Sequence, residues 1–200
     1  MRAIWTRIEN WLANNAPEIL RNLNPGATDK EIASTEEFLG ISFPDDFKDS
    51  YRIHNGQRSY IETPDEQQID YCLMGMWQLL SLDRIKDEWS CWKELLDDGA
   101  FDNSNITLDN GVVTAWWNPL WIPLTSDFCG DNHCLDLSLS LGGSEGQIVM
   151  MWHDLDPREI VAPSFKAWLE AFADDLEAGH YAFDPTISQV IDLRLEEPLS

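Results

Sequence analysis

The spacing of apolar residues in this chain changes about halfway along its length. In the first half, apolar residues recur every three or four positions, which indicates amphipathic helices over residues 4–12, 28–39, 44–55 and 82–96. From residue 112 they alternate with polar residues or stand in short runs, which indicates strands over residues 112–117, 121–124, 134–141, 147–152 and 159–162. A last helical stripe covers residues 164–178. Helices followed by an antiparallel sheet and a closing helix predict an α+β fold.

The clearest strand pattern lies at residues 134–141. Four leucines alternate there with polar or small residues, as in a sheet with one buried face and one solvated face. The glycine-rich segment 142–146 predicts a hairpin turn into the next strand. If the leucines point into the core, Asp136 must face solvent.

Charge limits the classes of partner. The 200 residues include 36 Asp and Glu against 13 Lys and Arg, which gives a formal net charge of −23. Such a charge repels phosphate backbones and anionic lipids and attracts basic proteins. We therefore expect neither a nucleic-acid partner nor a membrane partner. The charge can instead serve only to keep a chain with ten tryptophans soluble.

Charged residues interrupt the apolar positions at the N-terminus, so neither a signal peptide nor a membrane-spanning run is expected. We predict a cytoplasmic location. Four cysteines are too few for a disulfide scaffold in a chain of this length, and reduced thiols are expected.

The length predicts one domain, which we place at residues 1–180. Residues 170–200 contain eight acidic residues and one basic residue, Arg194. We assign residues 181–200 to an acidic C-terminal tail. Apolar residues between Ile187 and Leu195 leave open whether this tail docks as a short strand or helix.

The segment Gly142-x-Ser144-x-Gly146 matches the nucleophile-elbow pattern of hydrolases. That elbow joins a strand to a helix, whereas this segment is expected to join two strands. Glycines in a hairpin connection are explained by positive φ angles. We therefore expect Ser144 to have no catalytic role.

Potential metal ligands gather at Cys129, His133 and Cys134, with Asp127 and Asp131 nearby. A structural zinc site normally has four ligands in two separated pairs, and no second pair stands at a recognised spacing. A zinc site would need Cys72, Cys91 or His153 as the missing ligand. We favour a loop with buried cysteines and predict no metal and no cofactor.

Paired carboxylates such as Asp97-Asp98 and Asp174-Asp175 are the minimum that a glycosidase requires. In a chain with 36 acidic residues such pairs arise by chance. His54 and His180 have no nucleophile nearby in the sequence, and His153, within Trp152-His153-Asp154, is the first histidine to check in a structure. We predict that the chain is not an enzyme.

Several short motifs occur in a characteristic order between Trp5 and Tyr181. They include Pro25-Gly26-Ala27, Phe43-Pro44-Asp45-Asp46-Phe47 before His54-Asn55-Gly56, Trp121-Ile122-Pro123-Leu124 before Asp127, Leu135-Asp136-Leu137, and Ala162-Pro163-Ser164-Phe165 before Trp168-Leu169. In this order the chain resembles the SUKH superfamily, which includes yeast-type regulators of cell-wall glucan synthesis and bacterial immunity proteins that neutralise toxins. The resemblance implies a twisted, largely antiparallel sheet backed by helices. It also implies a function by binding rather than by turnover, and it names no partner.

Charge and resemblance together predict an immunity-type protein that masks a basic toxin, plausibly a nuclease, through an acidic surface. Asp127, Asp131 and Asp136 are expected to supply the charge of that surface. Trp116, Trp117 and Trp121 are expected to supply an exposed aromatic anchor. The alternative is a regulator of, or an enzyme in, cell-wall carbohydrate metabolism, since an aromatic ring beside carboxylates also suits sugar stacking.

Overall fold

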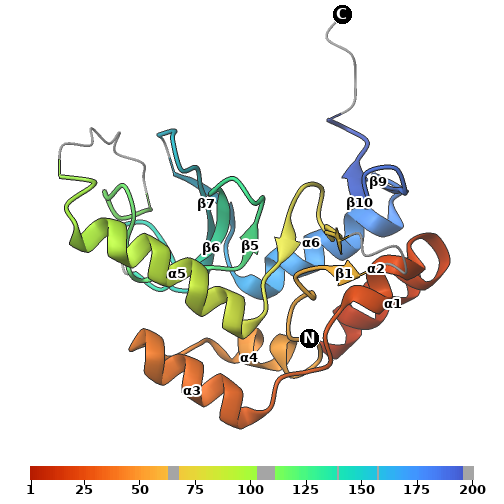
Figure 1. Cartoon of the computed structure of the whole chain (residues 1–200), viewed down its shortest axis with the longest axis horizontal. Helices are drawn as coiled ribbons and strands as arrows, with labels where there is room; N and C mark the ends of the chain where they lie inside the picture. Colours follow the sequence, from red (N-terminus) through yellow and green to blue (C-terminus); the bar gives the residue numbers. More distant parts are fainter. Residues whose placement is uncertain (63–67, 103–110, 139, 157, 196–200) are drawn as a thin grey trace, which may run out of the picture.

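The computed structural model of the chain describes residues 1–62, 68–102, 111–138, 140–156 and 158–195. The helices of this part are α1 (Arg2–Asn15), α2 (Pro17–Asn22), α3 (Asp29–Leu39), α4 (Asp45–Tyr51), α5 (Leu82–Asp97) and α6 (Phe165–Glu177). The strands are β1 (Ile61–Glu62), β2 (Gln68–Ile69), β3 (Gln78–Leu79), β4 (Trp121–Pro123), β5 (Thr125–Ser126), β6 (Asn132–Asp136), β7 (Gln147–Met151), β8 (Glu159–Ala162), β9 (Tyr181–Asp184) and β10 (Gln189–Asp192). This arrangement confirms the predicted α+β class (Figure 1).

The N-terminal helices begin where local sequence signals place them. Thr28 and Glu31 form a capping box at the start of α3, in which Thr28 Oγ1 accepts the Glu31 backbone N–H and the Glu31 carboxylate accepts the Thr28 N–H. Gly40 ends α3 in the left-handed conformation, with φ 69°. The helix predicted for residues 44–55 ends earlier, at Tyr51, and α2 was not predicted from the sequence.

The central sheet is antiparallel, with the strand order β4-β6-β7-β8. Its middle pair is the predicted hairpin, in which Leu135 lies opposite Ile148. In the connection between β6 and β7, Gly142 and Gly146 have φ angles of 90° and 83°, which explains these glycines conformationally.

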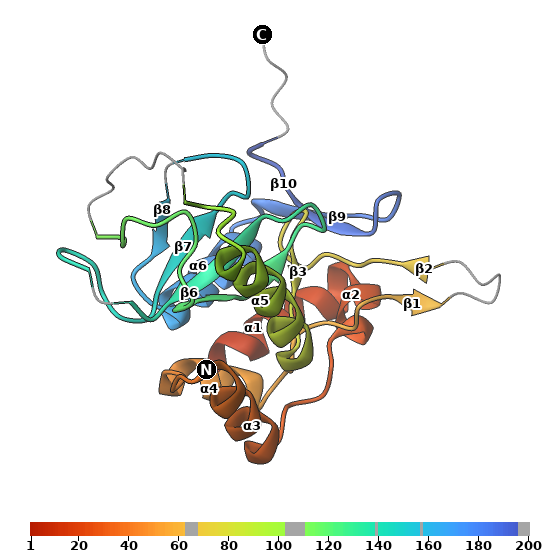
Figure 2. The same ribbon diagram turned by 60° about the vertical axis from the view of Figure 1, so that its left-hand side comes forward.

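Both faces of this sheet are covered, so the prediction of one solvated face is wrong. On one face, Ile122, Leu135 and Ile148 belong to the main core together with Phe165 and Leu169 of α6. On the other face, Trp121, Cys134 and Val149 pack with Trp92 of α5 and with Trp117. Figure 2 shows α5 and α6 on either side of the strands. The polar positions of β6 therefore face a second core instead of water.

Two further strand predictions differ from the structure. Residues 112–117, all of them described, lie in bends and irregular backbone and form no strand. Strand β6 ends at Asp136, five residues before the predicted end. Leu141 consequently leaves the core and is completely exposed, and Leu139 lies outside the described residues.

Residues 181–192, which the sequence assigns to an acidic tail, contain the β9–β10 hairpin. The hairpin docks on the body of the domain through backbone hydrogen bonds. The Val190 N–H donates to the Cys72 carbonyl at 3.1 Å, and the Gly75 N–H donates to the Val190 carbonyl at 2.7 Å. The Val190 side chain is fully buried. Docking as a strand, which the sequence left open, is what the structure shows for these residues.

Candidate functional site

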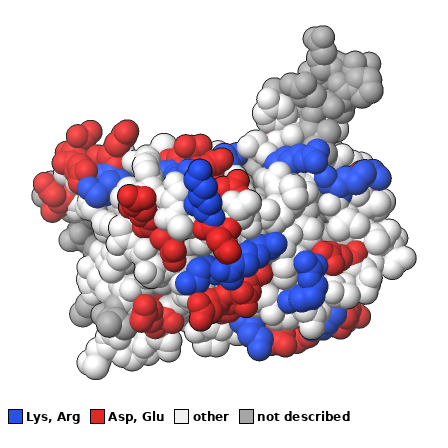
Figure 3. Space-filling view, turned by 90° about the horizontal axis from the view of Figure 1, so that it is seen from below, with Lys and Arg blue, Asp and Glu red and all other residues white. Residues whose placement is uncertain are grey.

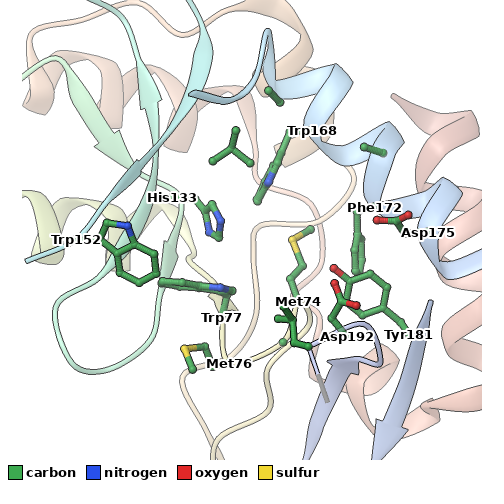
Figure 4. Close-up of a pocket in the computed structure, with 15 residues that line it drawn as sticks. Met74, Met76, Trp77, His133, Trp152, Trp168, Phe172, Asp175, Tyr181 and Asp192 are labelled. Carbon is green, nitrogen blue, oxygen red and sulfur yellow. The ribbon is translucent and has the colours of Figure 1, made fainter. Parts of the chain in front are cut away.

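A cavity of about 440 Å³ lies between the central sheet, α6 and the β9–β10 hairpin. Six of its lining residues carry aromatic rings, counting the His133 imidazole, and we call it the aromatic cavity. Its lining residues are Met74, Gly75, Met76, Trp77, His133, Trp152, Val161, Ala162, Trp168, Ala171, Phe172, Asp175, Tyr181, Asp192 and Leu195. Figure 4 shows Trp77, Trp152 and His133 on one side of the cavity, and Phe172, Tyr181, Asp175 and Asp192 on the other.

Regular elements hold most of these side chains in place. Trp168, Ala171, Phe172 and Asp175 are spaced by three, four and seven residues on α6, so they share one helical face. His133 projects from β6 on the same side of the sheet as Leu135, because side chains alternate along a strand. Tyr181 and Asp192 lie opposite each other in the hairpin.

The aromatic rings contact one another edge to face or at a tilt. The ring centroids of Trp77 and His133 are 4.6 Å apart, and those of His133 and Trp168 are 5.6 Å apart. On the opposite wall, Phe172 and Tyr181 have centroids 5.2 Å apart. These pairs fix the wall geometry and leave ring faces and edges available to a ligand.

His133 is neutral at physiological pH, because burial lowers its pKa to about 4. Its Nδ1 atom lies 3.0 Å from Thr125 Oγ1. That hydroxyl oxygen accepts the His133 backbone N–H at 2.9 Å and can donate its own proton to Nδ1. This arrangement favours the tautomer with the ring proton on Nε2, the nitrogen for which the described residues provide no partner.

The hairpin end of the cavity is acidic. The Arg194 guanidinium donates to Asp192 at 2.6 Å and to Asp175 at 2.9 Å, and it lies over the Tyr181 ring. The hydrogen bond from Arg194 lowers the pKa of Asp192. Partial burial opposes ionisation of Asp175, but hydrogen bonds from His180 and Arg194 outweigh it and lower the pKa of that carboxyl too. Two ionised carboxylates therefore share one guanidinium.

Apolar side chains extend from the cavity onto the surface. Met76, Val161 and Leu195, which all line the cavity, are 54%, 44% and 83% exposed. These exposed apolar side chains and the cavity form one continuous apolar surface.

The residues predicted as the binding surface lie elsewhere. Asp136 is fully buried, so its expected outward orientation is wrong. The Gln147 side chain donates to one of its carboxylate oxygens at 2.9 Å, and the backbone N–H and hydroxyl of Ser138 donate to the other. The physical reason is the cover that α5 and the tryptophans place over this face of the sheet.

The predicted aromatic anchor is also mostly interior. Trp121 is fully buried, Trp117 is nearly so, and neither can reach a partner in this conformation. Trp116 is half-buried and carries the Arg158 guanidinium 5.2 Å from its ring centroid.

Asp127 and Asp131 lie in the loop that enters β6. Asp127 is half-exposed and accepts the backbone N–H groups of Cys129 and Asp131 with one oxygen. Asp131 is only 9% exposed and accepts from the ring and backbone nitrogens of His153, at 2.8 and 2.7 Å. That hydrogen bond raises the pKa of His153.

The potential metal ligands do not converge. His133 and Cys134 project from opposite faces of β6, and Cys129 is exposed. Among the described residues, Asp131, His153 and Asp154 do have ligand atoms within 4.8 Å of one another. The ion pair between Asp131 and His153 accounts for this grouping.

Sequence reasoning missed every aromatic member of the cavity. Trp168 and Phe172 were assigned to the core as part of one apolar stripe. Asp175 lies one turn beyond Phe172 on the same face of α6. A carboxylate at that position could have indicated from the sequence that this end of the apolar stripe is not fully buried.

This combination of an α+β fold and an apolar cavity with few polar groups defines a module suited to binding. The model of the SMI1/KNR4 family (SUKH-1) matches residues 26–171, and the chain belongs to this family. The N-terminal helix α1 and the β9–β10 hairpin lie outside the matched region.

Three fungal relatives illustrate the match. The cell wall biosynthesis/cell cycle regulator smi1 of Schizosaccharomyces pombe is 30% identical over 90% of this chain and 37% of its own length. The cell wall assembly regulator SMI1 of Saccharomyces cerevisiae is 26% identical over 88% of this chain and 40% of its own length. The glucan synthesis regulatory protein of Neurospora crassa is 25% identical over 93% of this chain and 40% of its own length.

The chain thus spans about 40% of the length of these relatives. They are named as regulators rather than as enzymes, and with the family match they support a non-catalytic regulator or binding module. None of the helices within the described residues combines the length and apolar character needed to cross a lipid bilayer.

Proposed function

We propose that this chain is a non-catalytic module that binds a basic partner protein, and that the partner docks at the aromatic cavity. The observation that carries the proposal is the continuity between the cavity and the exposed side chains of Met76, Val161 and Leu195. A ligand that filled only the cavity would leave this apolar rim in water. A protein surface covers both.

Charge supports a basic partner. The net charge of −23 creates a long-range attraction that raises the association rate of a positively charged protein. On the face drawn in Figure 3, Lys and Arg lie among Asp and Glu, so the acidic excess does not form one continuous patch there. Charge would then mainly raise the association rate, and the cavity would determine which partner binds.

Two biological settings fit such a module. In the first, the partner is a toxin, such as a nuclease, and binding in the cytoplasm neutralises it. Basic nucleases need positive charge to hold phosphate backbones, and an acidic protein masks that charge. In the second, the module regulates cell-wall carbohydrate metabolism. The names of the matched relatives favour this second setting.

Affinity capture of the tagged chain from cells that produce it, followed by reconstitution with the purified partner, tests the proposal. We expect a basic protein at one copy per chain or in another fixed ratio. The complex should weaken by about tenfold between 50 and 300 mM salt, since screening reduces long-range attraction. A partner that is toxic to cells when expressed alone, and harmless when the chain is co-expressed, would identify the first setting.

Two results would contradict the proposal. One is a partner without basic character whose affinity does not depend on salt. The other is turnover of glycosidase or esterase substrates, with or without added zinc, at a rate that a structural variant of the cavity abolishes. That second result would identify the enzyme alternative.

A further inference from the structure

We propose that the aromatic cavity takes one apolar side chain of the partner, a leucine, methionine or phenylalanine, and that a neighbouring lysine or arginine of the same segment meets Asp175 and Asp192. This proposal rests on the proposed function and adds to it the chemistry of the recognised segment.

The composition of the cavity wall favours an apolar side chain as its occupant. Trp77, Trp168 and Phe172 present ring surfaces, and Met74 and Met76 add flexible, polarizable side chains that adapt to different shapes. A sugar would bring many hydroxyl groups into this wall, and most of them would lose hydrogen bonds to water without replacement. An apolar side chain loses none.

The polar groups on the sheet side are donors. The indole N–H of Trp168, a residue only 7% exposed, has no hydrogen-bond partner within the described part of the chain. His133 offers a second donor beside it, given the tautomer favoured above. A peptide bond next to the inserted side chain supplies the carbonyl oxygen that these donors lack.

The hairpin end favours a cation. Asp175 and Asp192 together carry two negative charges, and Arg194 supplies one positive charge. With His180, which hydrogen-bonds to Asp175, counted as neutral, one negative charge remains beside an apolar cavity, where weak hydration strengthens its attraction for a lysine or arginine. The aromatic face of Tyr181 lies at the same end and adds a cation–π partner.

The edge of the sheet argues for side-chain insertion rather than for an added strand. Strand β8 is the outer strand next to the cavity, and its pairing with β7 shifts register between Ile148 and Val149. Val161 falls at this irregularity and has no residue opposite it. A short, irregular edge is a poor template for a further strand. Val161 instead lines the mouth of the cavity.

The test uses a phage-displayed library of random peptides selected on the whole chain. Ala171→Trp serves for counter-selection, because Ala171 is an exposed residue on the cavity wall and a large ring there occupies the cavity. The matched control is Ala13→Trp, an equal change on the exposed side of α1.

We expect enriched peptides to combine a Leu, Met or Phe with a nearby Lys or Arg. A synthetic copy of the most enriched peptide should lose about tenfold or more in affinity when Ser replaces its apolar residue, or when Ala171→Trp replaces the wild-type chain. Replacing its basic residue with Glu should cost about tenfold. Ala13→Trp should bind as the wild type does. In nuclear magnetic resonance spectra, the peptide should shift the Trp168 indole N–H signal.

The inference is overturned if no peptide discriminates between the wild type and Ala171→Trp, or if the enriched peptides are acidic or lack an apolar residue. Capture of the partner by the two variants tests the proposed function separately from this inference. If a basic partner is captured equally by the wild type and Ala171→Trp, the module binds proteins through another surface. This inference and the proposed docking site then fail, and the proposed binding of a basic partner stands.

Discussion

Two groups of tryptophans lie on opposite faces of strand β6, and they are packed in different ways. Trp92, Trp117 and Trp121 form a closed cluster with Cys134, and all of these side chains are buried. Trp77, Trp152 and Trp168 surround the aromatic cavity with His133, and the first two are half-buried. His133 and Cys134 are neighbours in sequence, yet they belong to different groups because side chains alternate across a strand.

The difference shows what tryptophan contributes in each place. In the closed cluster the rings are buried among apolar side chains, so they stabilise the fold mainly through burial and dispersion. Around the cavity, part of each ring faces open space, and that part of the contact energy is available to a partner. The closed cluster should therefore control stability, and the aromatic cavity should control binding.

Replacing one ring in each group gives the largest expected effect. Trp121→Ala should lower the free energy of unfolding by about 3–5 kcal/mol, because it removes a fully buried ring and leaves a void. Trp152→Ala should lower it by about 1 kcal/mol, since its ring is half-buried at the cavity. Urea denaturation monitored by circular dichroism measures both values.

Equal losses of stability in these two variants would contradict the comparison. So would a Trp152→Ala variant that is strongly destabilised but still binds the partner normally. Trp121→Ala should alter partner binding only to the extent that it unfolds the chain.

Two aspartates near β6 provide the next contrast. Both oxygens of Asp136 accept hydrogen bonds from protein donors, so the amide of Asn would turn an NH₂ group toward a donor. Asp136→Asn should cost about 2–3 kcal/mol of unfolding free energy. In Asp127 a single oxygen accepts both backbone N–H groups, and Asn retains that oxygen. Asp127→Asn should cost less than about 0.5 kcal/mol.

Chemical denaturation of the two variants at one pH tests this pair. A mild effect of Asp136→Asn would mean that its buried hydrogen bonds are less important than their geometry indicates.

The sequence predicts much of the fold because local signals specify it. The capping box at Thr28, the glycine-rich turn after β6 and the apolar stripe of α6 each act within a few residues. The orientation of Asp136 could not be predicted in this way. It depends on α5, whose Trp92 comes from a segment about forty residues away and covers the second face of the sheet. An alternating pattern cannot distinguish water from a second core that contains a buried carboxylate.

The candidate site was even less accessible to sequence reasoning. Its walls come from the loop before β3, from β6, from α6 and from a hairpin that the sequence assigned to a tail. Only the folded chain brings Trp77 to His133 and Tyr181 to Phe172. The predicted site at Trp117, Trp121 and Asp136 used the same residue types, but these side chains pack inside the closed cluster or hydrogen-bond beside it.

On the cavity side of β6, the protonation of His133 makes the stability of the fold depend on pH. Burial lowers the pKa of His133 to about 4, compared with about 6.5 in an unfolded chain. Below pH 6.5 the unfolded chain takes up a proton at His133 and the folded chain does not. The free energy of unfolding therefore falls as pH decreases from about 6.5 to about 4, by on the order of 1–3 kcal/mol from this residue alone.

His133→Asn isolates this contribution, because Asn can keep a hydrogen bond to Thr125 and does not titrate. The difference in unfolding free energy between the wild type and this variant should depend on pH within that window and be constant above pH 7. A difference that does not change with pH would show that His133 is solvated in the folded chain.

The smallest expected effect on stability concerns the acidic end of the aromatic cavity. Arg194 is about half-exposed, and its ion pairs with Asp175 and Asp192 lie near the surface, so Arg194→Gln should change the unfolding free energy by less than about 1 kcal/mol. Its effect on binding should be favourable, because both carboxylates are then available to a basic partner. We expect the affinity for the selected basic peptide to rise by about two- to fivefold at low salt and to return toward the wild-type value at high salt. Arg21→Gln makes the same change in net charge on α2, at an exposed site paired with Glu18, and it separates this local effect from the overall charge. Equal gains for both variants in calorimetric titrations would assign the effect to net charge, and a loss of affinity in Arg194→Gln would show that this residue contacts the peptide or holds the hairpin in its binding position.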